Sequence, residues 1–112
     1  MAPGDIVWVA FLDTTGREQA GRRPALVVAS PGYLAVVDTL ALVVPVSTAD
    51  RGWPNHVPLT GPHGLAHASF AMTEQVRAIL RSRITRIGGA VDDRCLRRVR
   101  TWLSDFLDVG EV

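Results

Sequence analysis

The sequence predicts a mainly β fold (α+β), in which a compact barrel-like sheet packs against one helix. Three observations support this prediction. Several short runs of β-branched and apolar residues are separated by polar loops, Gly and Pro mark boundaries between the runs, and one amphipathic segment lies near the C-terminus. With 112 residues, of which 47% are hydrophobic and 21% charged, we expect one globular domain covering residues 1–112.

Three strands are predicted in the first half of the chain. The first covers residues 6–12, where β-branched and aromatic residues follow a Pro-Gly-Asp turn signal. A polar loop over 13–23 leads to the second strand, 25–29, whose continuous apolar run is short enough for a strand buried on both faces. Ser-Pro-Gly at 30–32 ends this strand, and a third strand follows over 39–46.

The second half is predicted to contribute three further strands. Residues 53–59 have the character of an edge strand, because Pro54 and Pro58 each lack a backbone N–H for pairing. Residues 68–80 fit neither a helical nor a strand period cleanly, and we interpret them as one strand. A shorter strand over 84–91 contains a Gly pair near its end.

The clearest predicted element is a C-terminal helix. Asp92 or Asp93 can cap its first turn and suits the positive end of the helix dipole, and Gly110 is expected to end it. Apolar residues recur at helical spacing: Leu96, Val99, Leu103, Phe106 and Leu107. This pattern predicts one apolar face that packs on the sheet.

Charge and cysteine content narrow the possible functions. Cys95 is the only cysteine, so an internal disulfide is excluded, and we expect a packing or partly exposed thiol that belongs to no metal cluster. All 12 basic residues are arginine, and eight of them lie between positions 77 and 100. Arginine pairs well with phosphate, which favours a nucleic-acid ligand, although solvated helix faces explain the bias equally well. No apolar run is long enough to span a membrane and the first residues do not resemble a signal peptide, so we expect a cytoplasmic protein.

The segment most suggestive of chemistry is the glycine-bracketed loop 16–24, which precedes the second strand. Pro24 fixes its own φ angle and favours extended geometry for Arg23, so this arginine has fewer conformations than an ordinary loop arginine. A cation held at the entrance of a strand can bind phosphate. From the residues alone, an ion pair of Arg23 with Glu18 or Asp13 is the slightly preferred explanation.

A series of short motifs covers most of residues 4–77. The motifs are Gly4-Asp5-Ile6-Val7-Trp8-Val9, Gly16-x-Glu18-Gln19-x-Gly21-x-Arg23-Pro24-Ala25-x-Val27-Val28, Val44-Pro45-Val46-Ser47-Thr48, Arg51-Gly52-Trp53-Pro54 and Glu74-Gln75-Val76-Arg77. In order and spacing they resemble the MazF/PemK toxin family. The resemblance implies an SH3-like barrel of the MazF/CcdB type with a packed C-terminal helix, and a homodimer.

The resemblance also implies a function. Most family members are endoribonucleases that need no metal or other cofactor, each the toxin of a type II toxin–antitoxin pair. They cut single-stranded RNA within short sequences, leave 2′,3′-cyclic phosphate and 5′-hydroxyl ends, and thereby inhibit translation and growth. The implied partner is a small acidic antitoxin. The alternatives are a non-enzymatic CcdB-like toxin that binds DNA gyrase, disfavoured because such toxins lack the Glu18, Arg23 and hydroxyl set, and a barrel that serves only as a binding module.

The resemblance implies catalytic roles for three residues. Arg23 matches the catalytic arginine, Ser47 stands where the family usually has a catalytic threonine, and Glu18 matches the loop glutamate. Attack of a ribose 2′-hydroxyl on its own phosphate is intramolecular, so the enzyme must align the RNA, neutralise the phosphorane and handle two protons. Arginine suits neutralisation because it stays charged, and a serine hydroxyl can bind a phosphate oxygen or orient the 2′-hydroxyl. Glu18 is either a base or a residue that positions Arg23.

Six further residues are candidates for binding RNA: Gln19, Thr48, Arg51, Trp53, Gln75 and Arg77. A tryptophan can stack on a base of single-stranded RNA, but Trp53 precedes a proline and a packing or dimer contact is nearly as common there. Gln75 can read a base edge or simply complete a loop.

Three histidines, His56, His63 and His67, raise the idea of a histidine nuclease. Two of them lie in the Pro/Gly-rich stretch 61–67 without a paired acid. We therefore interpret the histidines as surface-loop residues.

Overall fold

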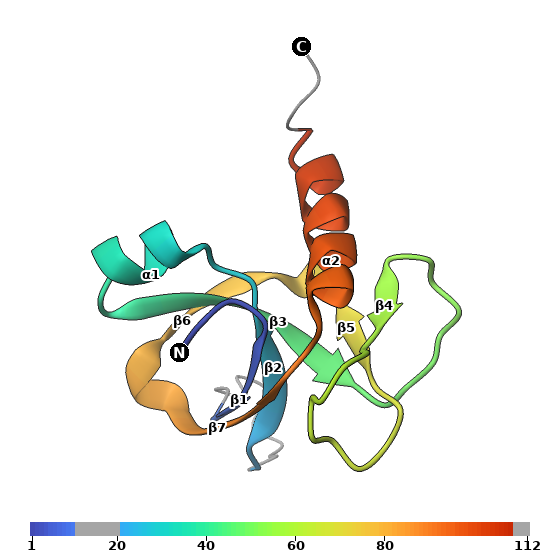
Figure 1. Cartoon of the computed structure of the whole chain (residues 1–112), viewed down its shortest axis with the longest axis horizontal. Coiled ribbons are helices and arrows are strands. Elements are labelled where there is room, and N and C mark those ends of the chain that lie inside the picture. Colours follow the sequence, from blue (N-terminus) through green and yellow to red (C-terminus); the bar gives the residue numbers. More distant parts are fainter. Residues whose placement is uncertain (11–20, 109–112) are drawn as a thin grey trace.

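The computed structural model describes residues 1–10 and 21–108 of the chain. These residues form seven strands, two α-helices and two short 3₁₀ helices (Figure 1). Their order and bounds are β1 (Asp5–Val9), β2 (Arg23–Val27), α1 (Pro31–Val36), β3 (Leu40–Ser47), β4 (His56–Pro58), β5 (Phe70–Met72), η1 (Thr73–Gln75), β6 (Arg77–Leu80), η2 (Arg81–Arg83), β7 (Ile84–Ala90) and α2 (Asp93–Phe106). The predicted mainly β fold with a C-terminal helix is confirmed.

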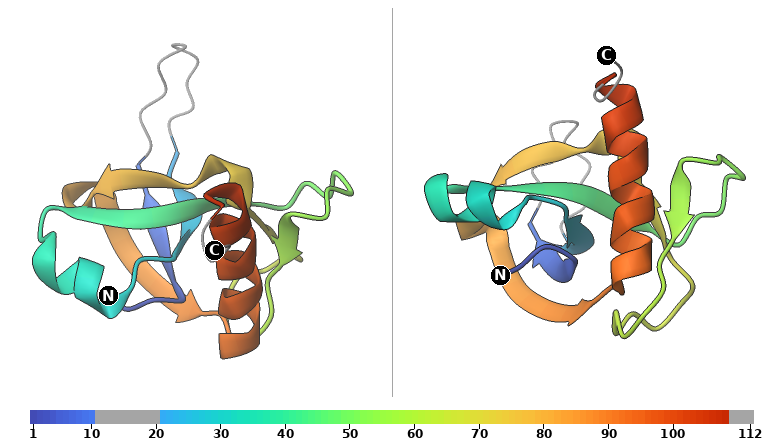
Figure 2. Two further views of the ribbon diagram at one scale, coloured as in Figure 1. Left: turned by 90° about the horizontal axis from the view of Figure 1, so that it is seen from above. Right: turned by 45° about the horizontal axis from the view of Figure 1, so that its top comes forward.

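Strand β3 organises the sheet. The strand order is β4-β5-β3-β2-β1-β7, with β6 joined to β3, and all pairs are antiparallel. One edge of β3 pairs with β2; the other edge pairs first with β6, along residues 40–43, and then with β5, at Val46 and Ser47. Because β5 and β6 share one edge of β3, β4 and β5 form a small layer apart from the curved main sheet (Figures 1 and 2).

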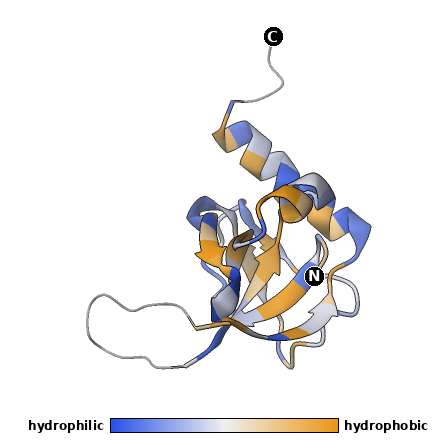
Figure 3. Cartoon of the chain, turned by 90° about the vertical axis from the view of Figure 1, so that its left-hand side faces the viewer, coloured by the Kyte–Doolittle hydropathy of each residue, from blue (hydrophilic) through white to orange (hydrophobic). Residues whose placement is uncertain are grey.

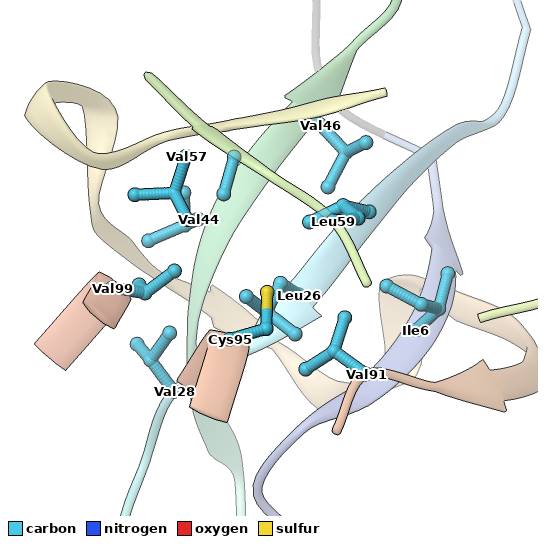
Figure 4. Packing of buried hydrophobic residues seen from close by; sticks show 11 residues of the cluster. Ile6, Leu26, Val28, Val44, Val46, Val57, Leu59, Val91, Cys95 and Val99 are labelled. Atoms are coloured by element: carbon cyan, nitrogen blue, oxygen red, sulfur yellow. The ribbon is translucent and has the colours of Figure 1, made fainter. Parts of the chain in front are cut away.

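Two clusters of buried side chains lie on the two faces of the central strands. Along β1, Val7 and Val9 belong to one cluster and Ile6 to the other, as the alternation of strand side chains requires. The first cluster joins β1, β2, β3 and β6 with α1. The second joins the opposite face of β1–β3 with β4, β5 and α2, around residues such as Leu26 and Val57 (Figure 4). Strand β2 is thus buried on both faces along most of its length, which explains its continuous apolar run.

Helix α2 is fixed at its first turn by Asp92. The carboxylate accepts hydrogen bonds from the backbone N–H of Cys95 at 2.8 Å and from the hydroxyl of Thr60 at 2.9 Å, which ties the helix start to the segment after β4. Hydrophobic and hydrophilic residues alternate along the helix (Figure 3), and its Cys95 and Val99 are buried. Burial raises the pKa of the Cys95 thiol, consistent with a packing role.

The end of α2 differs from the expectation. The apolar pattern continues to Phe106 and Leu107, but these side chains are 46% and 73% exposed, because the last turn extends beyond the sheet (Figure 1). The helix ends at Phe106, and Gly110, the predicted end, lies outside the described residues. No helix within the described ranges is long and apolar enough to cross a membrane.

The prediction of one strand over residues 68–80 is wrong. The segment divides into β5, η1 and β6, since β5 and β6 pair with different halves of β3. The buried hydroxyl of Thr73 donates to the carbonyl of Asn55 at 2.7 Å and so fixes the intervening turn. Strand β4 is at the sheet edge as predicted but covers only His56–Pro58 of the expected 53–59.

Sequence reasoning also missed helix α1. Ser30 and Pro31 were expected only to stop β2, yet the Ser30 hydroxyl caps the helix by accepting from the N–H of Tyr33, and Pro31 occupies its first turn. At the other end, the guanidinium of Arg81 donates to the carbonyls of Leu34 and Val37. This short helix is therefore held by groups at both of its ends.

Two of the arginines in the basic C-terminal third support the backbone. Besides its contacts with α1, Arg81 donates to the carbonyl of Leu40 at 2.9 Å. Arg100 on α2 donates to the carbonyls of Val28 and Ala29 at 3.1 and 3.2 Å. The arginine bias is thus partly structural.

The stability of the fold should depend on the ionisation of Asp92. Its hydrogen bond from Cys95 N–H, followed by that from Thr60, holds the pKa of this carboxyl below its ordinary value. A lowered pKa in the folded state stabilises the fold above the ordinary pKa, and this contribution is lost as the pH falls through the folded-state pKa. Asp92→Asn can still cap the helix but cannot titrate, so its melting temperature should fall less steeply between about pH 5 and pH 2. Asp93→Asn is the matched control; if both variants keep the wild-type slope, the proposed linkage is wrong.

Candidate functional site

Arg23 and Ser47 lie at the same end of two adjacent strands. Arg23 is the first residue of β2 and Ser47 the last residue of β3, and the last residue pair joining these strands is Ala25 with Pro45. Each candidate therefore stands two residues beyond that pair. From there β3 continues alongside β5, where Ser47 pairs with Phe70, and the ends of β2 and β3 diverge (Figure 1).

Strand alternation places the two candidate side chains on one face of the sheet. Arg23 shares its face of β2 with Ala25 and Val27, which are two and four residues away. Ser47 shares its face of β3 with Val43, which is four residues away. Ala25, Val27 and Val43 belong to the same buried cluster. The exposed side chain of Arg23 and the half-buried side chain of Ser47 thus lie on the same face as this cluster, at its solvent-facing edge.

The hydroxyl of Ser47 is oriented by its own loop. Its Oγ accepts a hydrogen bond from the backbone N–H of Ala49 at 3.0 Å, which leaves the hydroxyl hydrogen to donate elsewhere. The guanidinium of Arg23 offers several hydrogen-bond donors in a planar arrangement. Each of these groups can bind a phosphate oxygen.

Two candidates, Glu18 and Gln19, lie outside the described residues. Their roles therefore stay predictions. Pro24, which follows Arg23, lies opposite Trp8 in the β1–β2 register and is half-buried, so the backbone next to the candidate arginine belongs to the sheet.

Two arginines line an open pocket next to the start of β2. Trp8, Arg22, Thr85 and Arg86 surround a volume of about 490 Å³. The guanidinium of Arg86 lies 5.4 Å from the centroid of the Trp8 ring, within range of a cation–π interaction. Neither Trp8 nor Arg86 is among the candidate residues predicted from the sequence.

The loop between β3 and β4 carries three more candidates, and all are exposed: Thr48, Arg51 and Trp53. Asp50 shapes this loop by accepting from the N–H of Gly52 at 3.0 Å, and Gly52 adopts a φ of 73°, which favours glycine. Trp53 is 48% exposed. The loop that starts at Ser47 thus presents a cation and an aromatic ring to solvent.

The last two candidates flank the start of β6. Gln75 ends η1, and its amide nitrogen lies 3.4 Å from the carboxylate of Glu74 and 3.7 Å from the sulfur of Met72. Arg77 begins β6 opposite Val43 and is exposed.

A buried histidine joins these two regions, and the sequence interpretation of it was wrong. The side chain of His56, on β4, is 2% exposed, and its Nε2 lies 2.9 and 3.1 Å from the two carboxylate oxygens of Glu74. Its ring centroid is 4.8 Å from that of Trp53. Of the other two histidines, His67 is exposed as expected and His63 is half-buried.

Glu74 is held in its ionised form. Partial burial acts to raise its pKa, but hydrogen bonding and charge from His56 outweigh this, and the pKa of Glu74 lies below its ordinary value. Asn55 adds a hydrogen bond to the same carboxylate at 2.8 Å. His56 lies within the predicted edge strand 53–59, and this place in a strand was the sequence signal for its burial. The identity of its partner, Glu74, follows only from the fold.

Comparison with protein families gives a direct match. Residues 2–107 match the family described as PemK-like, MazF-like toxin of type II toxin–antitoxin system. The endoribonuclease toxin MazF of Escherichia coli K12 is 41% identical over 76 residues, which cover 68% of this chain and 65% of that protein. The match therefore spans slightly less than two thirds of the relative's length.

Solved structures agree with this assignment. A MazE–MazF structure from Deinococcus radiodurans has a TM-score of 0.78 and 29% identity, covering 98% of this chain and 97% of that one. A MazF structure from the same organism has a TM-score of 0.75 and 31% identity, with 97% of each chain covered. The fold and the family match extend over almost the whole chain, and the chain belongs to the family of PemK-like, MazF-like toxins of type II toxin–antitoxin systems.

Proposed function

We propose that this protein is a metal-independent, sequence-specific endoribonuclease that cleaves single-stranded RNA and so inhibits translation and growth. The observation that carries the proposal is the placement of Arg23 and Ser47 on one face, at the diverging ends of β2 and β3, in a chain of this family. Its relative in Escherichia coli is named an endoribonuclease toxin, which supports the same activity here.

The proposed reaction uses a nucleophile that the RNA itself supplies. The ribose 2′-oxygen attacks the adjacent 3′-phosphate, a bond from this oxygen to phosphorus forms, and the bond to the leaving 5′-oxygen breaks. Arg23 stabilises the charge of the phosphorane, and Ser47 binds a phosphate oxygen or orients the 2′-hydroxyl. The 2′-hydroxyl loses a proton and the leaving oxygen gains one; Glu18 is the proposed base or positions Arg23, and Arg23 is the proposed donor. The products are a 2′,3′-cyclic phosphate and a 5′-hydroxyl.

The proposed RNA-binding residues extend from this centre in two directions. Thr48, Arg51 and Trp53 lie on the loop that follows Ser47, and Gln75 and Arg77 lie around the start of β6; Gln19 is proposed from the sequence alone. Arginine can pair with phosphates, and the exposed Trp53 ring can stack on a base.

Two protein partners are proposed: a small acidic antitoxin and a second copy of this chain. The similar MazF of Deinococcus radiodurans has been solved with MazE, which supports an antitoxin for this chain. The exposed Phe106 and Leu107 at the end of α2 give apolar surface to an interface. We further propose that residues 1–112 act as one toxin domain and that the protein works in the cytoplasm, where its RNA substrate is found.

Arg23→Ala should reduce the cleavage rate by about 10²–10³-fold, because the variant loses a fixed donor to the phosphorane. Rates on a fluorescent RNA measure the loss, and circular dichroism checks the fold. Arg22→Ala is the matched control: it removes a neighbouring exposed arginine and should keep much more of the activity. A variant that cleaves normally without Arg23 would move the site elsewhere.

Ser47→Ala should cleave about 10²-fold more slowly, while Ser47→Thr, which keeps the hydroxyl, should stay active. The same rate assay compares the two. Because Ser47 also accepts from Ala49 N–H, the threonine variant controls for the loop. Wild-type rates in the alanine variant would show that the hydroxyl takes no part in catalysis.

Cleavage should be unaffected by EDTA and should stop when the ribose at the cleaved bond is replaced by 2′-deoxyribose, since the proposed nucleophile is then absent. Mass spectrometry of the fragments should find cyclic phosphate and 5′-hydroxyl ends. Fragments with 5′-phosphate ends, or cleavage of the deoxy substrate, would rule out this mechanism. Sequencing of the RNA ends identifies the recognised sequence.

A further inference from the structure

Trp53, His56, Glu74 and Gln75 form a connected set, here named the His56 cluster. The ring of Trp53 lies against the ring of His56, at 4.8 Å between centroids and with their planes inclined by 39°. His56 Nε2 contacts the Glu74 carboxylate at 2.9 Å, and the amide of Gln75 contacts the same carboxylate at 3.4 Å. The cluster thus connects two proposed RNA contacts, Trp53 and Gln75, that come from different segments of the chain.

The cluster is held by more than one bond. Asn55 donates from its side-chain amide to Glu74 at 2.8 Å and to the hydroxyl of Thr73 at 3.1 Å. That hydroxyl donates in turn to the backbone carbonyl of Asn55. The turn η1 is therefore fixed against the segment that leads into β4, and the Glu74 carboxylate has a defined position.

His56 carries an uncommon feature for a buried side chain. Within the part of the chain that the structure describes, its Nδ1 is buried and has no hydrogen-bond partner. A buried polar atom without a partner destabilises the fold, so packing alone does not favour a histidine here. What the ring does provide is one edge that donates to Glu74 and one flat surface that lies against Trp53.

The contacts of Gln75 follow from the same arrangement. Its amide nitrogen faces Glu74 and Met72, and among the described residues its carbonyl oxygen has no hydrogen-bond partner. That oxygen is an acceptor of the kind that can read the exocyclic amino group of adenine or cytosine.

We propose that the His56–Glu74 pair is a positioning device that fixes the ring of Trp53 and the amide of Gln75 relative to each other for binding RNA bases. The proposal rests on the proposed function. His56 is too buried to touch RNA, so it acts through its two neighbours. Loss of the pair leaves Arg23 and Ser47 in place, since these residues lie on β2 and β3.

The test measures RNA affinity separately from catalysis. The probe is a fully 2′-O-methylated oligonucleotide with the sequence that the protein is found to cleave; it cannot be cut because the 2′-hydroxyls are blocked. His56→Leu, which fills the buried position with an apolar side chain and removes the donor, should weaken binding about tenfold, as expected for one lost charge-assisted hydrogen bond. The KM for cleavable RNA should rise similarly, with kcat within about twofold of wild type.

Conservative and matched variants separate positioning from general damage. His56→Gln can still donate to Glu74 and should bind nearly as well as wild type, and His67→Leu is the control at an exposed histidine. Glu74→Ala removes the more exposed partner of the pair. This variant replaces His56→Leu in the test if His56→Leu does not fold. In a Trp53→Ala, Gln75→Ala background, loss of His56 or Glu74 should have no further effect on affinity.

Three outcomes would overturn the inference. These are wild-type affinity in both pair variants, an equal loss in the background without Trp53 and Gln75, or a fall in kcat with an unchanged KM. Failure of the proposed function looks different, because wild-type protein would then cleave no RNA. If wild-type protein cleaves RNA and Arg23→Ala does not, but the pair variants bind normally, only the positioning role is wrong.

Discussion

The exchange of partners along one edge of β3 is the constraint on which the rest of the structure depends. Strand β6 occupies residues 40–43 of that edge, and β5 occupies residues 46 and 47. Val44 and Pro45 lie in the interval, and a proline, which has no N–H to donate, is tolerated best where ladder pairing is interrupted. The chain between β5 and β6 must leave the sheet beside this interval, and it does so as η1, which carries Glu74 and Gln75. The pairing of β5 with residues 46 and 47 also extends β3 to Ser47.

The sequence predicts best the elements whose signals are local. The strands around Val7, Leu26 and Val44 are apolar runs between turn residues, and the helix cap at Asp92 is a single residue in the expected place. The break between β5 and β6 was not predicted, because it follows from the pairing of distant strands and leaves no clear period in residues 68–80. Helix α1 was missed because Ser30 and Pro31 can either stop a strand or start a helix.

The sequence motifs identify individual residues of the candidate site, and the fold determines which of them lie close together. Arg23 and Ser47 are far apart in the sequence and lie on neighbouring strands that share a face. Trp53 and Gln75 are connected through His56 and Glu74, which are 18 residues apart, so no short-range pattern identifies that contact. Glu18 lies outside the described residues, so its role is a prediction from the sequence.

The backbone contacts of Arg81 and Arg100 affect how ionic strength should act on the proposed RNA binding. Each protein cation that neutralises a phosphate releases counterions, and for single strands the logarithm of affinity falls by about 0.7 per contact for each decade of salt. Arg81 and Arg100 direct their donors to carbonyl oxygens inside the protein, and so they add little to this slope although they add to the net charge. The salt dependence of the proposed RNA binding should therefore be smaller than a count of the 12 arginines indicates, and its slope would report how many of the others reach the RNA backbone.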